Sequence, residues 1–161
     1  MDRTNELIVG IADIKVGEAP QLIKTNLGSC IAVCLYSKEK KVGGMLHLML
    51  ASSSGVSNRT ALKKEKYADT GIPELLQQLN RKYQVSQKDL VAKIFGGAKV
   101  LKMVARNIGE ENINAVRNIL KAENIRIIAS SVGGEKGYKV IFDLNTGQVI
   151  SQIFGTEPKE F

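Results

Sequence analysis

The chain has 161 residues, of which 43% are hydrophobic, and these values predict one compact domain over residues 1–161. A chain of this size can fill a core without disulfide bonds. It has no long apolar run, and acidic residues lie near its beginning, so we predict neither membrane insertion nor a secretory signal. We therefore expect a cytoplasmic protein, in which thiols stay reduced.

The net charge of +7 and the pI of about 9.4 raise the question of nucleic-acid binding. The 23 basic residues are scattered, however, and the densest run contains only Lys63, Lys64 and Lys66. Aromatic residues make up 5% of the chain and Trp is absent, which argues against a platform for base stacking. We predict no nucleic-acid partner, and the charge fits an acidic protein partner equally well.

Short apolar and β-branched runs predict strands in the first third of the chain. A polar turn, residues 37–40, joins the last two of these strands into a hairpin. Small polar residues and a glycine follow in residues 51–59, and they predict a long loop of the kind that is often mobile or functional. The predicted strands cover residues 6–16, 21–25, 31–36 and 41–50.

Two amphipathic helices are predicted in the remainder, because aliphatic residues recur there at helical spacing. The final residues, 155–161, are predicted to form a loosely ordered tail. The fold class is α/β of the α+β type, with mostly antiparallel strands and two main helices. The predicted helices cover residues 67–84 and 107–125, and the later strands cover 90–95, 126–131 and a hairpin over 139–154.

The first hairpin places a thiol near the one imidazole of the chain. A tight turn centred between Lys38 and Glu39 sets Cys30 opposite His47. One face of the hairpin then carries aliphatic residues and forms the core, while the face with Cys30 and His47 is smaller and more polar. Directly opposed residues have Cβ atoms about 4.5–5.5 Å apart, so the two side chains are predicted to be neighbours.

A cysteine beside a histidine suits nucleophilic catalysis, because the thiolate is the nucleophile and the imidazole takes its proton or stabilises its charge. We predict that His47 leaves the Cys30 thiol ionised and reachable. Gly28 and Ser29 directly precede this cysteine, and free N–H groups in such a turn can hold an oxyanion. For Ser29 a plain turn role fits equally well. The substrate class would be an acyl or amide carbon.

Each of these residues also has a purely structural interpretation. Cys34 lies between Val33 and Leu35 and is expected to be core, whereas Cys30 fits both interpretations. His47 taken alone fits a hydrogen-bonded structural histidine. Two cysteines and one histidine cannot supply four zinc ligands, and the C-x-x-x-C spacing is not that of a redox pair. We therefore predict neither a metal nor a cofactor.

Several motifs follow one another along the chain: T-N-L-G-S-C-I-A-V-C-L, GGMLHLMLA, KYADTGIPELL, KIFGGAKVL, NIGEENINAV and GGEKGYKVIFDLNTGQV. The first resembles the T-x-L-G-S-C-V-A-V signature of the chemoreceptor glutamine deamidase family, CheD. The others resemble further segments of the same family, among them its G-x-x-H-x-M-L-P, K-Y-A-D-T-A-I and K-x-F-G-G-A blocks. The resemblance covers nearly the whole chain, in the right order.

This resemblance implies hydrolysis of particular glutamine side chains on bacterial chemoreceptors, the methyl-accepting chemotaxis proteins, to glutamate and ammonia. It implies Cys30 as the nucleophile that forms a thioester, His47 as the general base, and Thr25 as a residue that orients or polarises the site. The implied fold is an α/β/β layered sandwich, similar to the catalytic part of cytotoxic necrotizing factor toxins. Some members also bind the phosphatase CheC, which makes CheC a candidate partner.

The chain departs from the family pattern at positions other than these three. Ser131 stands where the family commonly has an acidic residue, Tyr138 where it often has arginine, and Glu111 where N-I-G-x-R-N has arginine. These differences bear on receptor choice and partner binding, not on the reaction type. The alternative function is a non-catalytic adaptor that binds the chemoreceptor or CheC.

Overall fold

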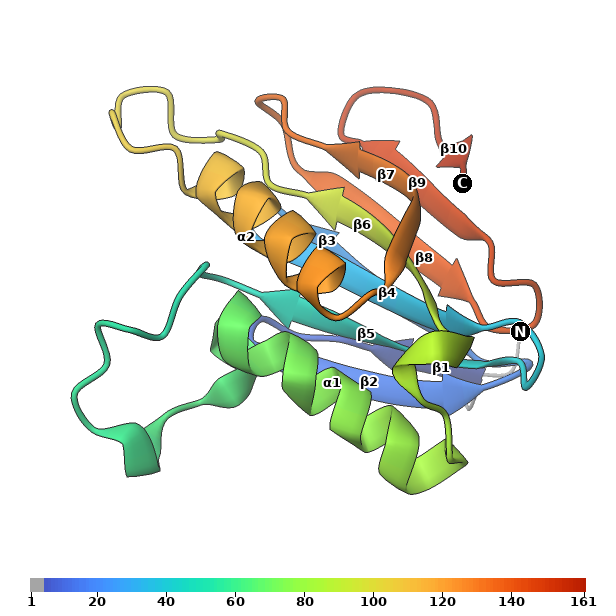
Figure 1. The fold of residues 1–161 in the computed structure, drawn as a ribbon. Helices are drawn as coiled ribbons and strands as arrows, with labels where there is room; N and C mark the ends of the chain where they lie inside the picture. Colours follow the sequence, from blue (N-terminus) through green and yellow to red (C-terminus); the bar gives the residue numbers. More distant parts are fainter. Residues whose placement is uncertain (1–4) are drawn as a thin grey trace.

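A computed structural model describes residues 5–161, which fold into three layers (Figure 1). Helices α1 (Ala68–Tyr83) and α2 (Ile108–Ala122) cover one face of a central five-stranded sheet. A second five-stranded sheet packs on the other face of the central sheet. The predicted α/β/β layered sandwich with two main helices is confirmed. Within residues 5–161, no helix is long and apolar enough to cross a membrane.

Most neighbouring strands of the two sheets are antiparallel, whereas β1 pairs with β3, and β6 with β7, in parallel. The central sheet has the order β2 (Asp13–Glu18), β5 (Val42–Leu48), β4 (Ile31–Ser37), β6 (Val91–Gly96) and β7 (Arg126–Val132). The outer sheet has the order β1 (Glu6–Ile8), β3 (Leu22–Leu27), β8 (Tyr138–Asp143), β9 (Val149–Ile153) and β10 (Lys159–Glu160).

The central hairpin of β4 and β5 is buried on both faces, because it lies between the two other layers. Ile31, Val33 and Leu35 pack toward the helices, as the alternation of the sequence predicts. Ala32 and Cys34 pack on the opposite face, against the outer sheet. The face predicted to be smaller and more polar is therefore a second core.

The turn of this hairpin is longer than predicted, and the register differs by two residues. Ser37 pairs with Val42, and the Lys41 N–H donates to the Ser37 carbonyl oxygen. Lys41 adopts a left-handed conformation with φ 53°, which closes a four-residue loop in place of the predicted tight turn. Ala32, not Cys30, consequently lies opposite His47.

The predicted strand over residues 6–16 divides into two strands that belong to different sheets. β1 pairs with β3 in the outer sheet, whereas β2 pairs with β5 in the central sheet. Ala12, with φ 55°, lies in the turn between them. The connection therefore carries the chain from one sheet to the other beside His47, whose carbonyl oxygen accepts from the Ala12 N–H.

The prediction of a loosely ordered tail over residues 155–161 is wrong. Residues Lys159–Glu160 form β10, which pairs with β9. The Phe161 N–H and C=O both bond to the backbone of Val149, and the Phe161 ring contacts the ring of Phe95 edge-on at 5.5 Å. These contacts fix the segment against the space between the sheets.

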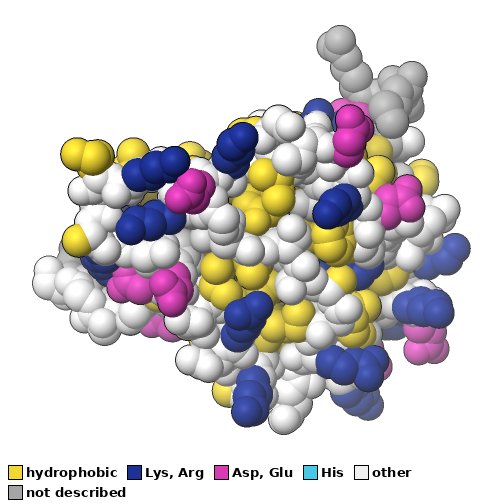
Figure 2. Space-filling model, turned by 90° about the horizontal axis from the view of Figure 1, so that it is seen from above, with side chains coloured by type: hydrophobic (Ala, Val, Ile, Leu, Met, Phe, Trp, Pro, Cys, Tyr) yellow, Lys and Arg dark blue, Asp and Glu magenta, His cyan; other side chains and the backbone are white. Residues whose placement is uncertain are grey.

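Figure 2 shows the molecule from above the view of Figure 1. Hydrophobic side chains gather in the middle of this face, and Lys and Arg side chains lie dispersed around them. The basic residues therefore form no continuous stripe on this face. No histidine is visible there, in keeping with the 2% exposed fraction of His47.

Candidate active site

The candidate site lies between the two sheets, where a hydroxyl from one sheet meets the imidazole from the other. Thr25 is on β3 and His47 is on β5, and both side chains are buried. Thr25 Oγ1 lies 2.8 Å from His47 Nδ1. The same hydroxyl donates to the Val9 carbonyl oxygen at 2.8 Å. The structure thus brings two of the three predicted catalytic residues into direct contact.

This arrangement determines which nitrogen of the imidazole carries the proton. A threonine hydroxyl has one proton, and that of Thr25 is donated to Val9. Thr25 Oγ1 can then only accept from His47, so Nδ1 must carry the proton. Nε2 is left with its lone pair, and it can accept a proton from another group.

The buried imidazole is uncharged near neutral pH. Burial lowers the pKa of His47, while the Val9 carbonyl and the charge of Asp13 oppose this shift. Asp13 lies opposite His47 in the β2–β5 ladder. A neutral imidazole with a free Nε2 is the protonation state that a general base requires.

Cys30 lies just before β4, in a segment whose carbonyl oxygens are all held by hydrogen bonds. The Gly28 oxygen accepts from the Ala98 N–H at 3.0 Å, and the Cys30 oxygen accepts from the Gly97 N–H at 2.9 Å. The Ser29 oxygen accepts from a side chain of α2 at 3.0 Å. Within residues 5–161, the N–H groups of residues 28–30 donate to no protein acceptor. Unpaired backbone N–H groups of this kind can hold an oxyanion.

The Cys30 thiol is partly buried and packs against the inter-sheet core. Burial raises the pKa of this thiol, and the Cys30 backbone N–H opposes the shift in part. The thiol is therefore protonated near neutral pH. The raised pKa does not agree with the prediction that His47 leaves this thiol ionised in the resting protein.

Cys30 and His47 lie on the same face of the hairpin but not directly opposite each other. Ala32 pairs with His47, and Cys30 lies two residues before Ala32, just outside β4. No hydrogen bond joins the thiol to the imidazole in the part of the chain that the structure describes.

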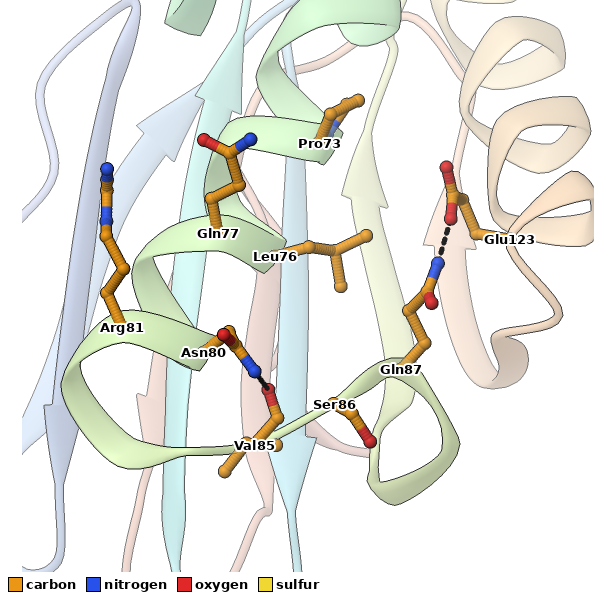
Figure 3. A pocket seen from close by; sticks show the side chains of 9 residues that line it. All are labelled: Pro73, Leu76, Gln77, Asn80, Arg81, Val85, Ser86, Gln87 and Glu123. Atoms are coloured by element: carbon orange, nitrogen blue, oxygen red, sulfur yellow. Dashed lines mark hydrogen bonds between the residues drawn. The ribbon is translucent and has the colours of Figure 1, made fainter.

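Two cavities lie at the candidate site, and Cys30 lines neither of them. One, of about 380 Å³, is lined by Thr25 and His47 together with the exposed Ile11. The other, of about 180 Å³, is lined by Ser29 and by residues from 98–109, which include Lys99 and Arg106 as well as apolar side chains. A cavity of about 390 Å³ beside α1, shown in Figure 3, contains none of the predicted site residues, so we do not assign it to the reaction.

The second cysteine is not part of this site. Cys34 has an exposed fraction of 1%, and burial raises the pKa of its thiol far above the ordinary value. It packs among Met45 and Phe95 between the sheets. Its predicted role as a core residue is confirmed.

Two contributors to the site escape the sequence prediction. The role of the Val9 carbonyl could not be predicted, because every residue type has the same backbone carbonyl. Asn112 of α2 donates to the Ser29 and Met49 carbonyl oxygens. The sequence feature that could have indicated this role is its position as a polar residue on the apolar stripe that includes Val116.

The fold and the site together define a layered α/β/β protein with a candidate thiol–imidazole centre. A family model described as CheD chemotactic sensory transduction matches residues 49–152. A protein of Desulforamulus reducens named "Probable chemoreceptor glutamine deamidase CheD" is 42% identical over 159 residues, which covers 96% of this chain and 94% of the relative. A protein of the same name from Methanococcus vannielii is 41% identical, over 89% of this chain and 92% of the relative. The chain belongs to the CheD family.

Two of the departures from the family pattern make specific contacts. Tyr138 is buried, and its hydroxyl donates to the Gly133 carbonyl oxygen at 2.9 Å. Glu111 accepts two hydrogen bonds from Arg106, at 2.7 and 3.1 Å, and so joins α2 to the loop before it. Both residues therefore shape the loops around the site rather than its reacting groups.

We expect Gly96→Ala to impair both folding and reaction. Gly96 has φ 104°, and a Cβ there would be pressed against the Cys30 carbonyl oxygen. The substitution should cost about 1–3 kcal/mol of unfolding free energy and displace Cys30. Denaturant unfolding and glutamine conversion measure the two effects. Gly55→Ala is the control, since its Cβ would meet no atom within 4 Å.

Proposed function

We propose that this protein hydrolyses glutamine side chains of bacterial chemoreceptors to glutamate, with Cys30 as nucleophile, His47 as general base and Thr25 as the residue that orients the imidazole. The hydrogen bond between Thr25 and His47 carries the proposal, because it leaves Nε2 unprotonated on the face that Cys30 shares. The names of the two relatives supply the substrate class.

In the first half of the reaction, His47 Nε2 takes the thiol proton as Cys30 Sγ attacks the carbonyl carbon of the glutamine side chain. The tetrahedral intermediate collapses when its carbon–nitrogen bond breaks. The imidazolium returns its proton to the departing nitrogen, which leaves as ammonia. The product of this half is a thioester between Cys30 and the substrate.

In the second half, water attacks the thioester and His47 takes a proton from that water. The carbon–sulfur bond then breaks, the sulfur recovers its proton, and glutamate leaves. The free N–H groups of residues 28–30 support stabilisation of the oxyanion in both halves, with Gly28 and Ser29 as further donors beside Cys30. No redox step occurs, and these steps use no cofactor.

The reaction places a negative charge on the receptor where a neutral amide stood. Like charges on neighbouring helix positions weaken packing by roughly 0.2–0.5 kcal/mol each. Such a change can bias a receptor between two signalling states, which is how we propose that the protein acts in chemotaxis and adaptation. The proposal places the reaction in the cytoplasm, where the Cys30 thiol stays reduced.

The direct test is to incubate a purified chemoreceptor signalling fragment with the protein and to map amide-to-acid mass shifts peptide by peptide, together with ammonia release. We expect conversion at particular glutamines. Binding of the fragment without any conversion would instead indicate the adaptor function. A parallel pull-down with the phosphatase CheC tests the partner that the family resemblance implies.

We expect Thr25→Val to reduce kcat by roughly 10- to 100-fold, because the isosteric side chain cannot accept from Nδ1 and no longer fixes the imidazole. The measurement is receptor-fragment conversion under saturating substrate. Thr25→Ser keeps the hydroxyl and should stay within a few-fold of wild type. Equal rates for Thr25→Val and wild type would remove Thr25 from the mechanism.

A further inference from the structure

Asn112 is a fully buried polar residue that joins the two halves of the candidate site. It projects from α2, and its exposed fraction is 0%. Its Nδ2 donates to the Ser29 carbonyl oxygen at 3.0 Å and to the Met49 carbonyl oxygen at 2.9 Å. One amide therefore connects the residue before Cys30 to the chain just after His47.

The orientation of this amide is unambiguous. Both protons of Nδ2 are used on carbonyl oxygens, and a flipped amide would place Oδ1 against the same two oxygens. In the present orientation Oδ1 is buried without a hydrogen-bond partner among the described residues. The side chain therefore satisfies two backbone carbonyls and leaves one buried acceptor of its own unpaired.

The contact with Ser29 has a direct consequence for Cys30. The Ser29 carbonyl and the Cys30 N–H belong to one peptide group, which is planar and trans. The N–H therefore points in the direction opposite to the oxygen that Asn112 holds. The Gly28 and Cys30 carbonyls are held in turn by Ala98 and Gly97, so the free N–H groups of this segment have a fixed orientation.

We propose that Asn112 is a positioning residue, which holds the Ser29–Cys30 peptide so that the Cys30 N–H faces the oxyanion formed during glutamine hydrolysis. This inference rests on the proposed function. Asn112 touches neither substrate nor reacting atoms in this account, and it acts only through the backbone. Its bond to Met49 keeps the end of β5, and with it His47, in register with the same segment.

The test is Asn112→Leu, which keeps most of the side-chain volume and removes both donors and the orphaned oxygen. We expect kcat for the receptor fragment to fall by roughly 10- to 100-fold, while KM changes less than about 3-fold. A peptide aldehyde that replaces the target glutamine forms a thiohemiacetal with Cys30, and its inhibition constant should rise by a similar factor. Both effects report on the oxyanion and not on substrate docking.

The matched control is Val116→Ala, which truncates another fully buried side chain of α2 that packs in the helix-side core. It should lower the melting temperature and leave kcat near the wild-type value at a temperature well below melting. If Asn112→Leu does not fold, Asn112→Ser replaces it, since a hydroxyl cannot span both carbonyls, and the same loss in kcat is expected.

A kcat for Asn112→Leu, or for its replacement, within about 2-fold of wild type would overturn the inference. A rise in KM with unchanged kcat would overturn it too, because that result places the residue in docking. Wild type is measured first on the same fragment. If wild type itself converts no glutamine, the proposed function fails, which is a different outcome from the failure of Asn112 alone.

Discussion

Cys30→Ala should abolish glutamine conversion, with a residual rate below roughly one thousandth of wild type. Without the sulfur no thioester can form, and the remaining site can only polarise the substrate. Peptide mapping of the receptor fragment after long incubation measures the residual rate. Folding should be preserved, because the thiol is only partly buried and its removal leaves a small void.

Cys34→Ala provides the matched control for this result. It removes the same chemical group from a position sealed between the sheets. We expect a lower melting temperature and a nearly unchanged conversion rate. If Cys30→Ala and wild type convert equally, or if Cys34→Ala is the inactive variant, the assignment of the nucleophile is wrong.

His47→Gln should reduce kcat/KM by roughly 10²–10⁴-fold, the range expected for loss of a general base. Glutamine keeps a polar group near Thr25 but cannot take the thiol proton. Because the Cys30 thiol is protonated at rest, the rate should depend on this base at every pH below the thiol pKa. A variant that retains its rate would show that Cys30 is activated in another way.

The pH profile of wild type gives an independent check on His47. Its pKa is lowered below the ordinary value of about 6.5, so the base is present at neutral pH and is lost as pH falls through this lower value. The acid limb of kcat/KM should therefore lie below pH 6.5. The limb should disappear in His47→Gln, since no titrating base remains. An acid limb above pH 7 would indicate a different group.

Secondary structure followed closely from the sequence where local pattern determines it. Leu75 and Leu79 of α1, and Ile113 and Val116 of α2, were predicted from their helical spacing to face the core. All four are buried in the structure. The alternation in β4 gave the correct core face. Such patterns record which side of an element is buried, and a layered fold is built from those sides.

Features that depend on a turn or on distant pairing were not recoverable. The predicted β4–β5 register was wrong by two residues, because Lys41 adopts a left-handed conformation in the turn. Lysine is not a residue type that indicates such a conformation. The segment 155–161 has loop-like composition, yet Phe161 pairs with Val149 and packs on Phe95. These contacts come from residues far away in the sequence, so no local window contains them.

The residues of the candidate site were predicted from residue type and motif, whereas the burial of Cys30 and His47 was not predicted. The prediction that Cys30 and His47 share one face holds in spite of the register error. Side chains alternate between faces, so an error of two residues does not change the face. The neutral state of both groups follows from burial in the inter-sheet space, which the sequence did not reveal on this side of the hairpin. We therefore propose that the thiol loses its proton during attack, in place of the predicted resting thiolate.

The most direct test of the covalent route is hydroxylamine trapping during turnover of the receptor fragment. Hydroxylamine attacks a thioester and releases the substrate as a glutamyl hydroxamate, with the Cys30 thiol regenerated. The account predicts hydroxamate at the same glutamines that wild type converts, in a proportion that rises with hydroxylamine concentration, and none with Cys30→Ala. Glutamate formed at an unchanged rate with no hydroxamate at any concentration would contradict it.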